Sequence, residues 1–387
     1  MQVQQYLKDH GLAKYGLAGL QEEYGIEVRD YPDRVVLNYS QIDSPRFHPI
    51  CDECRALILR KDTWDVLARS FDRFFNIGEG DEWKRHDISK ARIDEKLDGS
   101  IMSVYWDGDK WCVSTRKMGY AEGTNIFGKS FRQLFDEAAV KTELWKFLDS
   151  ASQFKQFTWV FELTSQENRI VTRYSETSIT LIGARHNLFG GELNGKELDD
   201  AAKEIKVARP KSFKFTNLED TIKATRELDT LDEGFVLVWE NDRGESSYRL
   251  KCKNERYVAI AHMRENGQIS PKNILAMIMA NETSEYIGYF PEDEPYISFV
   301  EPIYKDSYNR IIEINNKHMT IKDQKEFALT IMPLCKYGFE KGTLFAMRKG
   351  GDFDTLLLEL GAKKIAKELK LKERFAKEFN VQVDDEE

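Results

Sequence analysis

The stretch Glu95–Ser100, with the sequence EKLDGS, is the most informative part of the chain and comes just before a predicted strand. A lysine amine is a nucleophile only when it is unprotonated, so a catalytic Lys96 needs a lowered pKa, which nearby cations provide. Asp98 could orient the amine or a metal-bound water, and Gly99 permits a tight turn close to a ligand. The pattern on its own is equally typical of a charged surface turn.

Short strands and tight turns surround this stretch. The predicted strands are Ile101–Tyr105, Trp111–Thr115, Phe157–Leu163, Ser178–Gly183, Phe235–Trp239 and Tyr248–Lys253. The dipeptide Asp107-Gly108 separates the first two, and residues 241–244, with the sequence NDRG, separate the last two. Both turns are typical of β-hairpins.

Three of the downstream strands carry charged residues at suggestive positions. In Phe157–Leu163, the alternation of a strand puts Trp159 and Phe161 on one face and Glu162 on the other, where its carboxylate can project into a cleft. Glu233-Gly234 is an acidic-glycine step that opens the next strand.

The strand Tyr248–Lys253 presents Arg249, Lys251 and Lys253 on one face and apolar side chains on the other. Cations on one side and apolar groups on the other suit a polyphosphate site built against a core. The alternative is a half-buried strand with a solvated charged face.

The pattern changes from mixed to helical after about Tyr257. Before it, residues 130–148 predict a helix with Phe131, Leu134, Phe135 and Ala138 on one face. The later helix signals are Ser270-Pro271, a cap at Thr320 for a helix toward Met332, and residues 353–380 interrupted near Gly361. We therefore expect an α+β domain over residues 1–257 and an all-α domain over residues 258–387.

Composition sets only broad limits on function. The 387 residues carry a net charge of −9, which argues against indiscriminate coating of nucleic acid but allows a locally basic cleft. The longest apolar run, Ile274–Ala280, is too short to cross a membrane. Five cysteines imply no disulfide framework, and no secretory signal is recognisable at the N-terminus. A cytoplasmic protein is the default expectation.

Four motifs of this chain, taken in order, resemble the covalent nucleotidyltransferase superfamily of ATP-dependent ligases and mRNA capping enzymes. They are Lys96-x-Asp-Gly, the strand-borne Glu162, Glu233-Gly and Lys251-x-Lys253. The phage-type RNA ligase 1 family, the single-strand and tRNA-repair branch, is the nearer match. The features that carry this second resemblance are Glu53-Cys54-Arg55, Arg73-Phe74-Phe75-Asn76 and Asn168-Arg169-Ile170-Val171. It implies an antiparallel-sheet nucleotidyltransferase domain, an ATP-grasp-like ligase adenylation domain, followed by helices.

The resemblance also implies an activity. Lys96 attacks the α-phosphorus of ATP and becomes a lysyl-AMP, the AMP passes to an RNA 5′-phosphate, and a 3′-hydroxyl then displaces it. ATP and Mg²⁺, with Mn²⁺ as a substitute, are the implied cofactors. The implied partners are single-stranded RNA ends, with a cleaved tRNA anticodon loop as one candidate. We expect a monomer, no membrane contact and, if the chain is phage-encoded, the host cytoplasm.

The same resemblance assigns roles to individual residues. Glu233 would hold the metal, and Glu162 would lie near the ribose or a metal-bound water. Lys251 and Lys253 would contact the nucleotide phosphates and help to keep Lys96 unprotonated. The remaining nucleotide-site residues that it implies are Arg55, Arg73, Phe75, Asp98, Gly99 and Arg116.

The chain departs from the family pattern at a few positions. Arg73 stands where the family usually has lysine, which keeps the charge but changes the donor geometry. Lys117 could replace Arg116 as the basic residue after the hairpin, although we favour Arg116. Leu37 replaces an aromatic residue, and no acid near Ser284-Glu285 can be matched to a metal ligand in the C-terminal domain.

Several alternatives remain open. A DNA ligase or a GTP-using capping enzyme would normally follow the Lys-x-Lys strand with a β-barrel domain, where this chain predicts helices. A non-catalytic RNA-binding protein with a nucleotide pocket is the third possibility. His48, Cys51 and Cys54 could form part of a zinc site, but no second pair completes four ligands. Residues 361–380 carry a net charge of +4, which fits either RNA phosphates or a solvated helix face.

Overall fold

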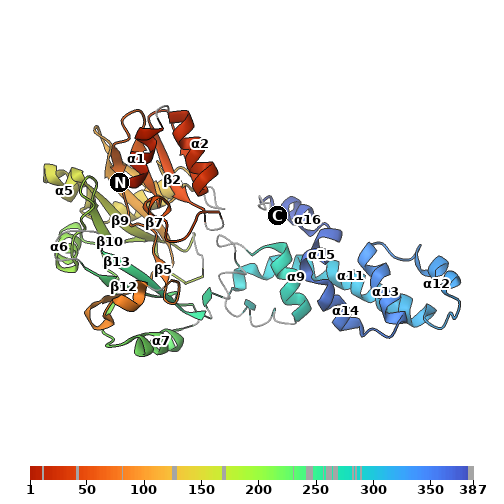
Figure 1. Cartoon of the computed structure of the whole chain (residues 1–387). Helices are drawn as coiled ribbons and strands as arrows, with labels where there is room; N and C mark the ends of the chain where they lie inside the picture. Colours follow the sequence, from red (N-terminus) through yellow and green to blue (C-terminus); the bar gives the residue numbers. More distant parts are fainter. Residues whose placement is uncertain are drawn as a thin grey trace. The chain divides into compact units, whose positions relative to one another are not determined.

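The computed structural model shows two compact units, Met1–Ala261 and His262–Glu387. It describes residues 1–10, 13–40, 43–80, 82–123, 129–167, 171–229, 231–240, 247–255, 257–258, 264, 269–280, 283, 286–287 and 290–381. The first unit is mixed α and β and the second is helical, as expected (Figure 1). The functions assigned to the two domains stay predictions.

Within its described residues, the first unit contains three sheets. Sheet 1 has the order β1(Ile26–Asp30), β2(Arg34–Tyr39), β3(Leu57–Arg60), β4(Val66–Ala68). Sheet 2 has the order β10(Ser178–His186), β9(Phe157–Thr164), β7(Ser100–Trp106), β8(Trp111–Thr115). Sheet 3 has the order β11(Ser212–Phe213), β6(Arg92–Glu95), β12(Gly234–Trp239), β13(Tyr248–Lys253), β5(Phe75–Asn76). The named strands pair antiparallel except β13 with β5, so the predicted antiparallel architecture is confirmed.

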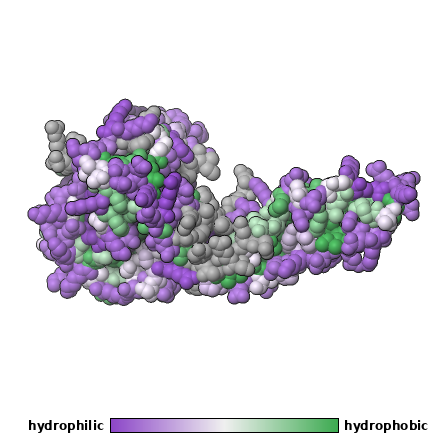
Figure 2. Space-filling view, turned by 90° about the horizontal axis from the view of Figure 1, so that it is seen from below, coloured by the Kyte–Doolittle hydropathy of each residue, from purple (hydrophilic) through white to green (hydrophobic). Residues whose placement is uncertain are grey.

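Helices cover these sheets because their apolar faces need burial. Those of the first unit are α1(Gln2–Asp9), α2(Ala13–Tyr24), α3(Pro49–Glu53), α4(Phe131–Ala139), α5(Leu144–Asp149), α6(Gly195–Ile205) and α7(Leu218–Glu227). Short 3₁₀ segments occur at Glu82–Arg85, Ile88–Lys90 and Ser152–Gln156. Side chains of α1, α2 and α3 share a core with sheet 1, those of α4, α5 and α6 with sheet 2, and those of α7 with sheet 3. Hydrophilic residues dominate the face drawn in Figure 2.

The predicted strand pattern orients the residues that matter for the site. Trp159 and Phe161 of β9 lie in the core beneath α4, α5 and α6, so Glu162 points to the other face of sheet 2. Leu250 and Cys252 of β13 lie in the core beneath α7, which leaves the cations of β13 on the opposite face of sheet 3. Both predicted alternations are therefore confirmed, and the two charged faces border one cavity.

The second unit is helical throughout its described residues. Its elements are α9(Pro271–Ala280), the 3₁₀ segment Pro291–Asp293, α11(Glu294–His318), α12(Gln324–Ile331), α13(Gly338–Arg348), α14(Phe353–Leu360), α15(Ala362–Glu368) and α16(Leu371–Phe379). Leu371 and Phe375 of α16 are buried, as their spacing predicts. Among the described residues of both units, none of the helices combines the length and the apolar character needed to cross a membrane.

Two predicted helical regions differ from those observed. The single helix expected over residues 130–148 is observed as two helices, α4 and α5. Between them, the Thr142 hydroxyl donates to the Ala139 carbonyl at 2.7 Å and accepts a hydrogen bond from Leu144 N, which interrupts the helix. Residues 353–380 form three helices, with breaks at Gly361 and at Lys370, whose φ angles are +79° and +53°. The predicted hairpin turn at 241–244, Ser284-Glu285 and the acidic residues 384–387 lie outside the described residues.

The predicted cap of α12 is also wrong. Thr320 lies just after the end of α11, and the side chain of Asp323 accepts the hydrogen bond from Glu326 N at 2.8 Å. An N-cap carboxylate satisfies an otherwise unpaired helix N–H and interacts favourably with the helix dipole.

We therefore expect the Asp323→Ala variant to destabilise α12 by about 1 kcal/mol. Amide hydrogen exchange of peptides from α12 should then accelerate by about fivefold, and mass spectrometry would measure it. The matched control is Thr320→Ala, which should leave this exchange unchanged. A faster exchange in Thr320→Ala than in Asp323→Ala would show that the cap is assigned to the wrong residue.

Candidate active site

Lys96 lies at the point where sheet 3 meets the loop leading into sheet 2. Its backbone N–H donates to the Gly234 carbonyl at 2.8 Å, which continues the pairing of β6 with β12. The side chain is 20% exposed, and its Nζ is 2.5 Å from Glu233 Oε2. Glu233 Oε1 is 3.1 Å from Lys253 Nζ. A single buried carboxylate thus bridges two ammonium groups.

The charge state of Lys96 differs from the prediction. Burial alone would lower the pKa of Lys96, but the carboxylates of Glu233 and Glu162 outweigh it, so the pKa is raised. The expected lowering by neighbouring cations is therefore wrong for this arrangement. The nearest charge to the amine is an acid, and the amine is a charged ammonium while that ion pair persists.

Glu162 accepts a hydrogen bond from the backbone N–H of Gly99 at 3.1 Å. Burial raises its pKa to about 7, with Glu233 adding to the rise while Lys96 and Arg55 oppose it. Only glycine fits at position 99, because a Cβ there would lie 2.4 Å from the Leu163 carbonyl oxygen. Gly99 was predicted to allow the backbone to approach a ligand closely. In the structure, the group that it approaches closely is the backbone of β9.

Asp98 is a positioning residue in this structure. Its Oδ2 accepts from the backbone N–H groups of Val171 and Thr172, both at 2.7 Å, and its Oδ1 accepts from the Tyr257 hydroxyl at 2.7 Å. Its own N–H donates to the Tyr174 hydroxyl. With three acceptor positions occupied inside the protein, Asp98 fixes the loop after Lys96. The observed contacts therefore do not support the predicted role in orienting the amine.

The cations of the site gather around Phe74. Arg55 lies 5.1 Å and Lys251 Nζ 4.8 Å from the centre of this ring. Burial lowers the pKa of Arg55 to about 10 and that of Lys251 to about 7, and their neighbouring cations reinforce the lowering at Lys251. Within the described part of the chain, Arg55 Nη1 is buried without a hydrogen-bond partner. Such unmatched positive charge fits an anionic ligand.

Arg73, Phe75 and Arg116 lie near the same edge of the site. The Arg73 guanidinium is 4.2 Å from the centre of the Tyr39 ring and 5.2 Å from that of the Phe75 ring. The Arg116 guanidinium is 4.5 Å from the centre of the same Tyr39 ring. Arg116 is anchored by Asn38 Oδ1 at 2.9 Å. Lys117 instead pairs with the exposed Glu27, which favours Arg116 as the predicted basic residue.

Leu37 is fully buried in the core beneath α1 and α2, consistent with no stacking role. Sequence reasoning missed Tyr39, Phe74 and Tyr257. Phe74 lies between Arg73 and Phe75, which the resemblance singled out, and Tyr39 lies two residues after Leu37, but neither pattern indicates that a ring meets a cation. Of the motif at 168–171, only Val171 lies within the described residues.

Two cavities open on Lys96. One of about 120 Å³ is lined by Glu233, Thr172 and Tyr174 on the side of β11 and the loop before β12. The other, of about 90 Å³, lies between sheets 2 and 3 and combines Arg55 and Glu162 with apolar side chains. Its apolar lining residues are Phe71, Phe74, Leu97, Ile101, Ile182, Pro210, Val236 and Val238, and its other charged lining residues are Arg92, Asp94, Glu95, Lys96 and Arg249. Apolar walls combined with charged groups suit a nucleotide.

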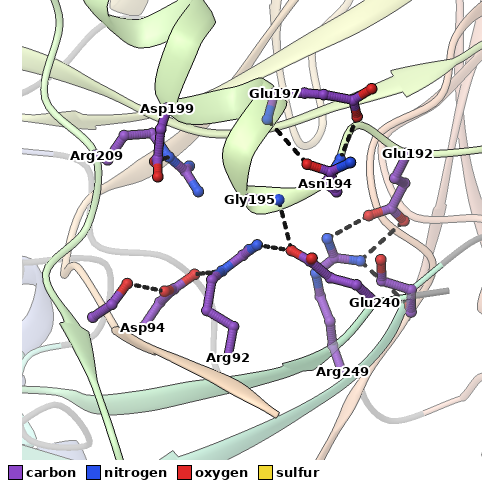
Figure 3. Close-up of polar contacts among 12 residues, drawn as sticks. Arg92, Asp94, Glu192, Asn194, Gly195, Glu197, Asp199, Arg209, Glu240 and Arg249 are labelled. Carbon is purple, nitrogen blue, oxygen red and sulfur yellow. Dashed lines mark hydrogen bonds and ion pairs between the residues drawn. The ribbon is translucent and has the colours of Figure 1, made fainter. Parts of the chain in front are cut away.

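Figure 3 shows a charged network that includes Arg92, Asp94 and Arg249, which line this second cavity. Arg249 is 7% exposed and pairs bidentately with Glu192, which is 3% exposed. Arg92 contacts both Asp94 and Glu240, and Glu240 accepts from Gly195 N at the start of α6. Arg249 therefore shares a strand face with Lys251, as predicted. Its guanidinium forms an ion pair with Glu192, which connects sheet 3 to the segment before α6.

The donor set gives limited support for a metal. Within the described residues, no three His, Cys, Asp or Glu side chains are grouped to hold a metal ion. The two acids near Lys96, Glu162 and Glu233, could supply two oxygen ligands, with water and substrate phosphates supplying the others, as Mg²⁺ commonly requires. Burial, together with the nearby Glu233 carboxylate, raises the pKa of Glu162, and a cation bound by the two acids would offset both effects.

The zinc alternative finds no support among the described residues. Cys51 and Cys54 are buried, and burial raises the pKa of both thiols, Cys51 to about 11. Cys51 Sγ contacts the Tyr24 carbonyl, and the His48 ring lies against the ring of Tyr24. Neutral thiols in an apolar core are typical of packing residues.

The chain is similar in sequence to known proteins. A family model described as "RNA ligase" matches residues 53–257. A protein of Autographa californica nuclear polyhedrosis virus, named as a candidate bifunctional polynucleotide kinase/RNA ligase, is 30% identical over 300 residues, 72% of this chain and 41% of that protein. An RNA ligase of Rhodothermus phage RM378 is 25% identical over 317 residues, 67% of this chain and 70% of that protein.

The chain thus spans about two fifths of the baculovirus protein's length. Among solved structures, an archaeal ATP-dependent RNA ligase gives a TM-score of 0.47 at 13% identity, covering 86% of this chain and 90% of that one. A Naegleria gruberi RNA ligase gives 0.37 at 15% identity, covering 47% and 54%.

The ion pair in Figure 3 generates a stability prediction. We expect the Arg249→Met variant to lower the free energy of unfolding by about 3–5 kcal/mol, because it removes the bidentate ion pair of the buried Glu192 carboxylate. The double variant with Glu192→Met should recover most of this loss. Urea denaturation at pH 7 measures both, and equal losses in the single and double variants would contradict the assignment.

Lys251 generates a pH prediction. Because its pKa is lowered to about 7, it is partly neutral above that pH, and a bound polyphosphate should restore its proton. The affinity for ATP without divalent metal should then fall as pH rises above 7, by up to about tenfold per pH unit. Calorimetry in two buffers of different ionisation enthalpy should detect proton uptake, which the always-charged Lys251→Arg variant should abolish. Equal uptake by both proteins would exclude Lys251 as its source.

Proposed function

The chain belongs to the RNA ligase family, and on that premise we propose that it is an ATP-dependent enzyme that joins the 3′-hydroxyl and 5′-phosphate ends of RNA. The observation that carries the proposal is the placement of Lys96 beside Glu233 and Lys253, at the end of a cavity lined by Arg55 and Glu162. A nucleophilic amine, an acid and several cations thus meet where a nucleoside triphosphate could lie between two sheets.

In the first step, the Lys96 nitrogen forms a bond to the α-phosphorus of ATP, the bond to pyrophosphate breaks, and a lysyl-AMP results. The ammonium must first lose a proton to solvent and give up its ion pair with Glu233. The protein's contribution is to align the attack and to neutralise charge with Lys251, Lys253 and Arg55, which is the main requirement of phosphoryl transfer. Burial of Lys96 lowers the cost of the neutral amine once Glu233 has a different partner.

In the second and third steps, the AMP moves to the RNA 5′-phosphate oxygen, and the RNA 3′-hydroxyl then attacks that phosphate with release of AMP. Lys96 accepts its proton back when the phosphoramidate breaks. Glu233 and Glu162 would hold a Mg²⁺ ion, for which Mn²⁺ could substitute, and the ion would supply charge neutralisation at the reacting phosphates. Glu162 is also suitably placed to contact a ribose.

The choice among ligases rests on the family and the second unit. Its described residues are helical, whereas a DNA ligase or capping enzyme would be expected to follow the Lys-x-Lys strand with a β-barrel. By resemblance, this unit selects RNA, with a cleaved tRNA anticodon loop as the candidate substrate. A monomer acting in the cytoplasm, without a membrane partner, completes the proposal.

The test is joining of a 5′-phosphorylated single-stranded RNA in the presence of ATP and Mg²⁺. Wild-type protein should circularise or join it and release AMP, and removal of the metal with a chelator should stop the reaction. Lys96→Ala should abolish joining, and Glu233→Gln should reduce it by about 10²-fold or more, since it removes the charge that both lysines contact.

Three control reactions separate the alternatives. GTP in place of ATP tests for a capping enzyme, and a nicked DNA duplex tests for a DNA ligase. The variant Lys117→Ala, an exposed lysine paired with Glu27, should join RNA at the wild-type rate. Joining by Lys96→Ala, or preference for nicked DNA, would overturn the proposal.

A further inference from the structure

Phe47 has a backbone conformation that a bulky residue rarely adopts. Its φ angle is +60°, in the left-handed region, although it is neither glycine nor asparagine. The side chain is 47% exposed, so burial in a core does not account for this conformation. Strained residues that the surroundings hold in place are concentrated at ligand sites. The contacts of the exposed ring indicate which ligand this is.

The ring of Phe47 is held on one side by the protein. Its centre is 4.2 Å from that of Phe75, with the planes tilted by 34°. Gly80 leaves room for it, because a Cβ at position 80 would lie 2.7 Å from Phe47 Cζ. The Arg73 guanidinium donates to the carbonyls of Ser44 and Pro45, at 3.4 Å each, just before Phe47 in the chain. The ring is thus fixed before any ligand arrives.

From Phe75 onward, aromatic rings and guanidinium groups alternate. Arg73 lies between the rings of Phe75 and Tyr39, and Arg116 follows on Tyr39. We call Phe47, Phe75, Arg73, Tyr39 and Arg116 the aromatic row. The row includes two arginines, and its outermost member is a half-exposed ring.

The row begins beside the phosphate-binding strand. Phe75 pairs with Leu250 and Asn76 with Lys251, in the parallel pairing of β5 with β13. Phe75 is therefore next to the cations that would contact the nucleotide phosphates. The cavity between sheets 2 and 3 is lined by the neighbouring Phe74, whereas neither Phe47 nor Phe75 belongs to its lining.

From this arrangement we propose that Phe47 stacks on the terminal nucleobase of the RNA end, while Arg73 and Arg116 contact its phosphates. The proposal rests on the proposed function and names a binding surface for its substrate. Proteins that bind single-stranded RNA combine aromatic stacking with a basic track in this way. The ring face of Phe47 would be sequence-tolerant, because every base offers a flat surface.

The experiment measures binding and joining separately. Fluorescence anisotropy with a labelled single-stranded RNA tests binding without any catalysis. We expect Phe47→Ala to weaken binding by about 5- to 100-fold, the range for loss of one base–aromatic stack. Phe47→Trp should restore it and Phe47→Leu should not. The matched control is Phe189→Ala, which removes a 79% exposed ring outside the row and should bind normally.

RNA that lacks its terminal base identifies the contact. Wild-type protein should join RNA with an abasic 5′-terminal or 3′-terminal nucleotide at a higher KM, and the end that shows this effect is the one that stacks. Phe47→Ala should then show no further loss with that substrate. Formation of the enzyme–AMP adduct from ATP alone should be the same in Phe47→Ala and wild type, which separates RNA stacking from adenine stacking.

Three results would overturn the proposal: normal RNA binding by Phe47→Ala, an additive loss on both abasic substrates, or a slower adduct formation from ATP. Circular dichroism of Phe47→Ala should show an unchanged melting temperature, and Phe47→Leu provides a second variant that keeps the apolar volume. If wild type forms no adduct, the proposed function fails, whereas the anisotropy measurement still decides the role of Phe47.

Discussion

The carboxylate of Glu233 is the group on which the arrangement of the site depends. It is 6% exposed and contacts Lys96 on one oxygen and Lys253 on the other. Without it, two ammonium groups would face each other in a partly dehydrated pocket, at an electrostatic cost that a protein interior does not tolerate easily. The same contact keeps Lys96 protonated, so structural stability and nucleophilicity are opposed at this residue.

This opposition gives a physical reason for a metal-dependent reaction. A cation that competes for Glu233 would release the Lys96 amine at the moment when substrate phosphates are present. Glu162, whose pKa burial raises to about 7, lies beside the same amine and would be stabilised in its ionised form by such a cation. The free lysine would then be neutral in a buried position, with Arg55 and Lys251 disfavouring its reprotonation.

Sequence reasoning assigned the charged residues of β9 and β13 to the correct strand faces, because both strands alternate regularly. The pattern in β9 put Glu162 opposite Trp159 and Phe161, and the pattern in β13 separated Lys251 and Lys253 from the core; both hold in the structure. Sequence reasoning failed for the charge state of Lys96, because this charge state depends on the residue that contacts the Lys96 amine in the folded protein, which is Glu233. Spacing along the chain contains no information about this partner.

Asp98, Arg249 and Phe47 show the same limit. The first two were read as functional charges, but Asp98 is engaged by Val171, Thr172 and Tyr257, and Arg249 by Glu192, residues distant in sequence. Phe47 has no local pattern at all, and its left-handed backbone is visible only in three dimensions. The N-cap of α12 was missed for a related reason, since Thr320 and Asp323 are both residue types that cap helices.

The most direct test of the central claim is to locate the AMP. After incubation with ATP and Mg²⁺ but no RNA, proteolysis and tandem mass spectrometry should find one AMP on the peptide that contains Lys96, linked through its side-chain nitrogen. An AMP on Lys251 or Lys253, or protein that stays unmodified, would contradict the account.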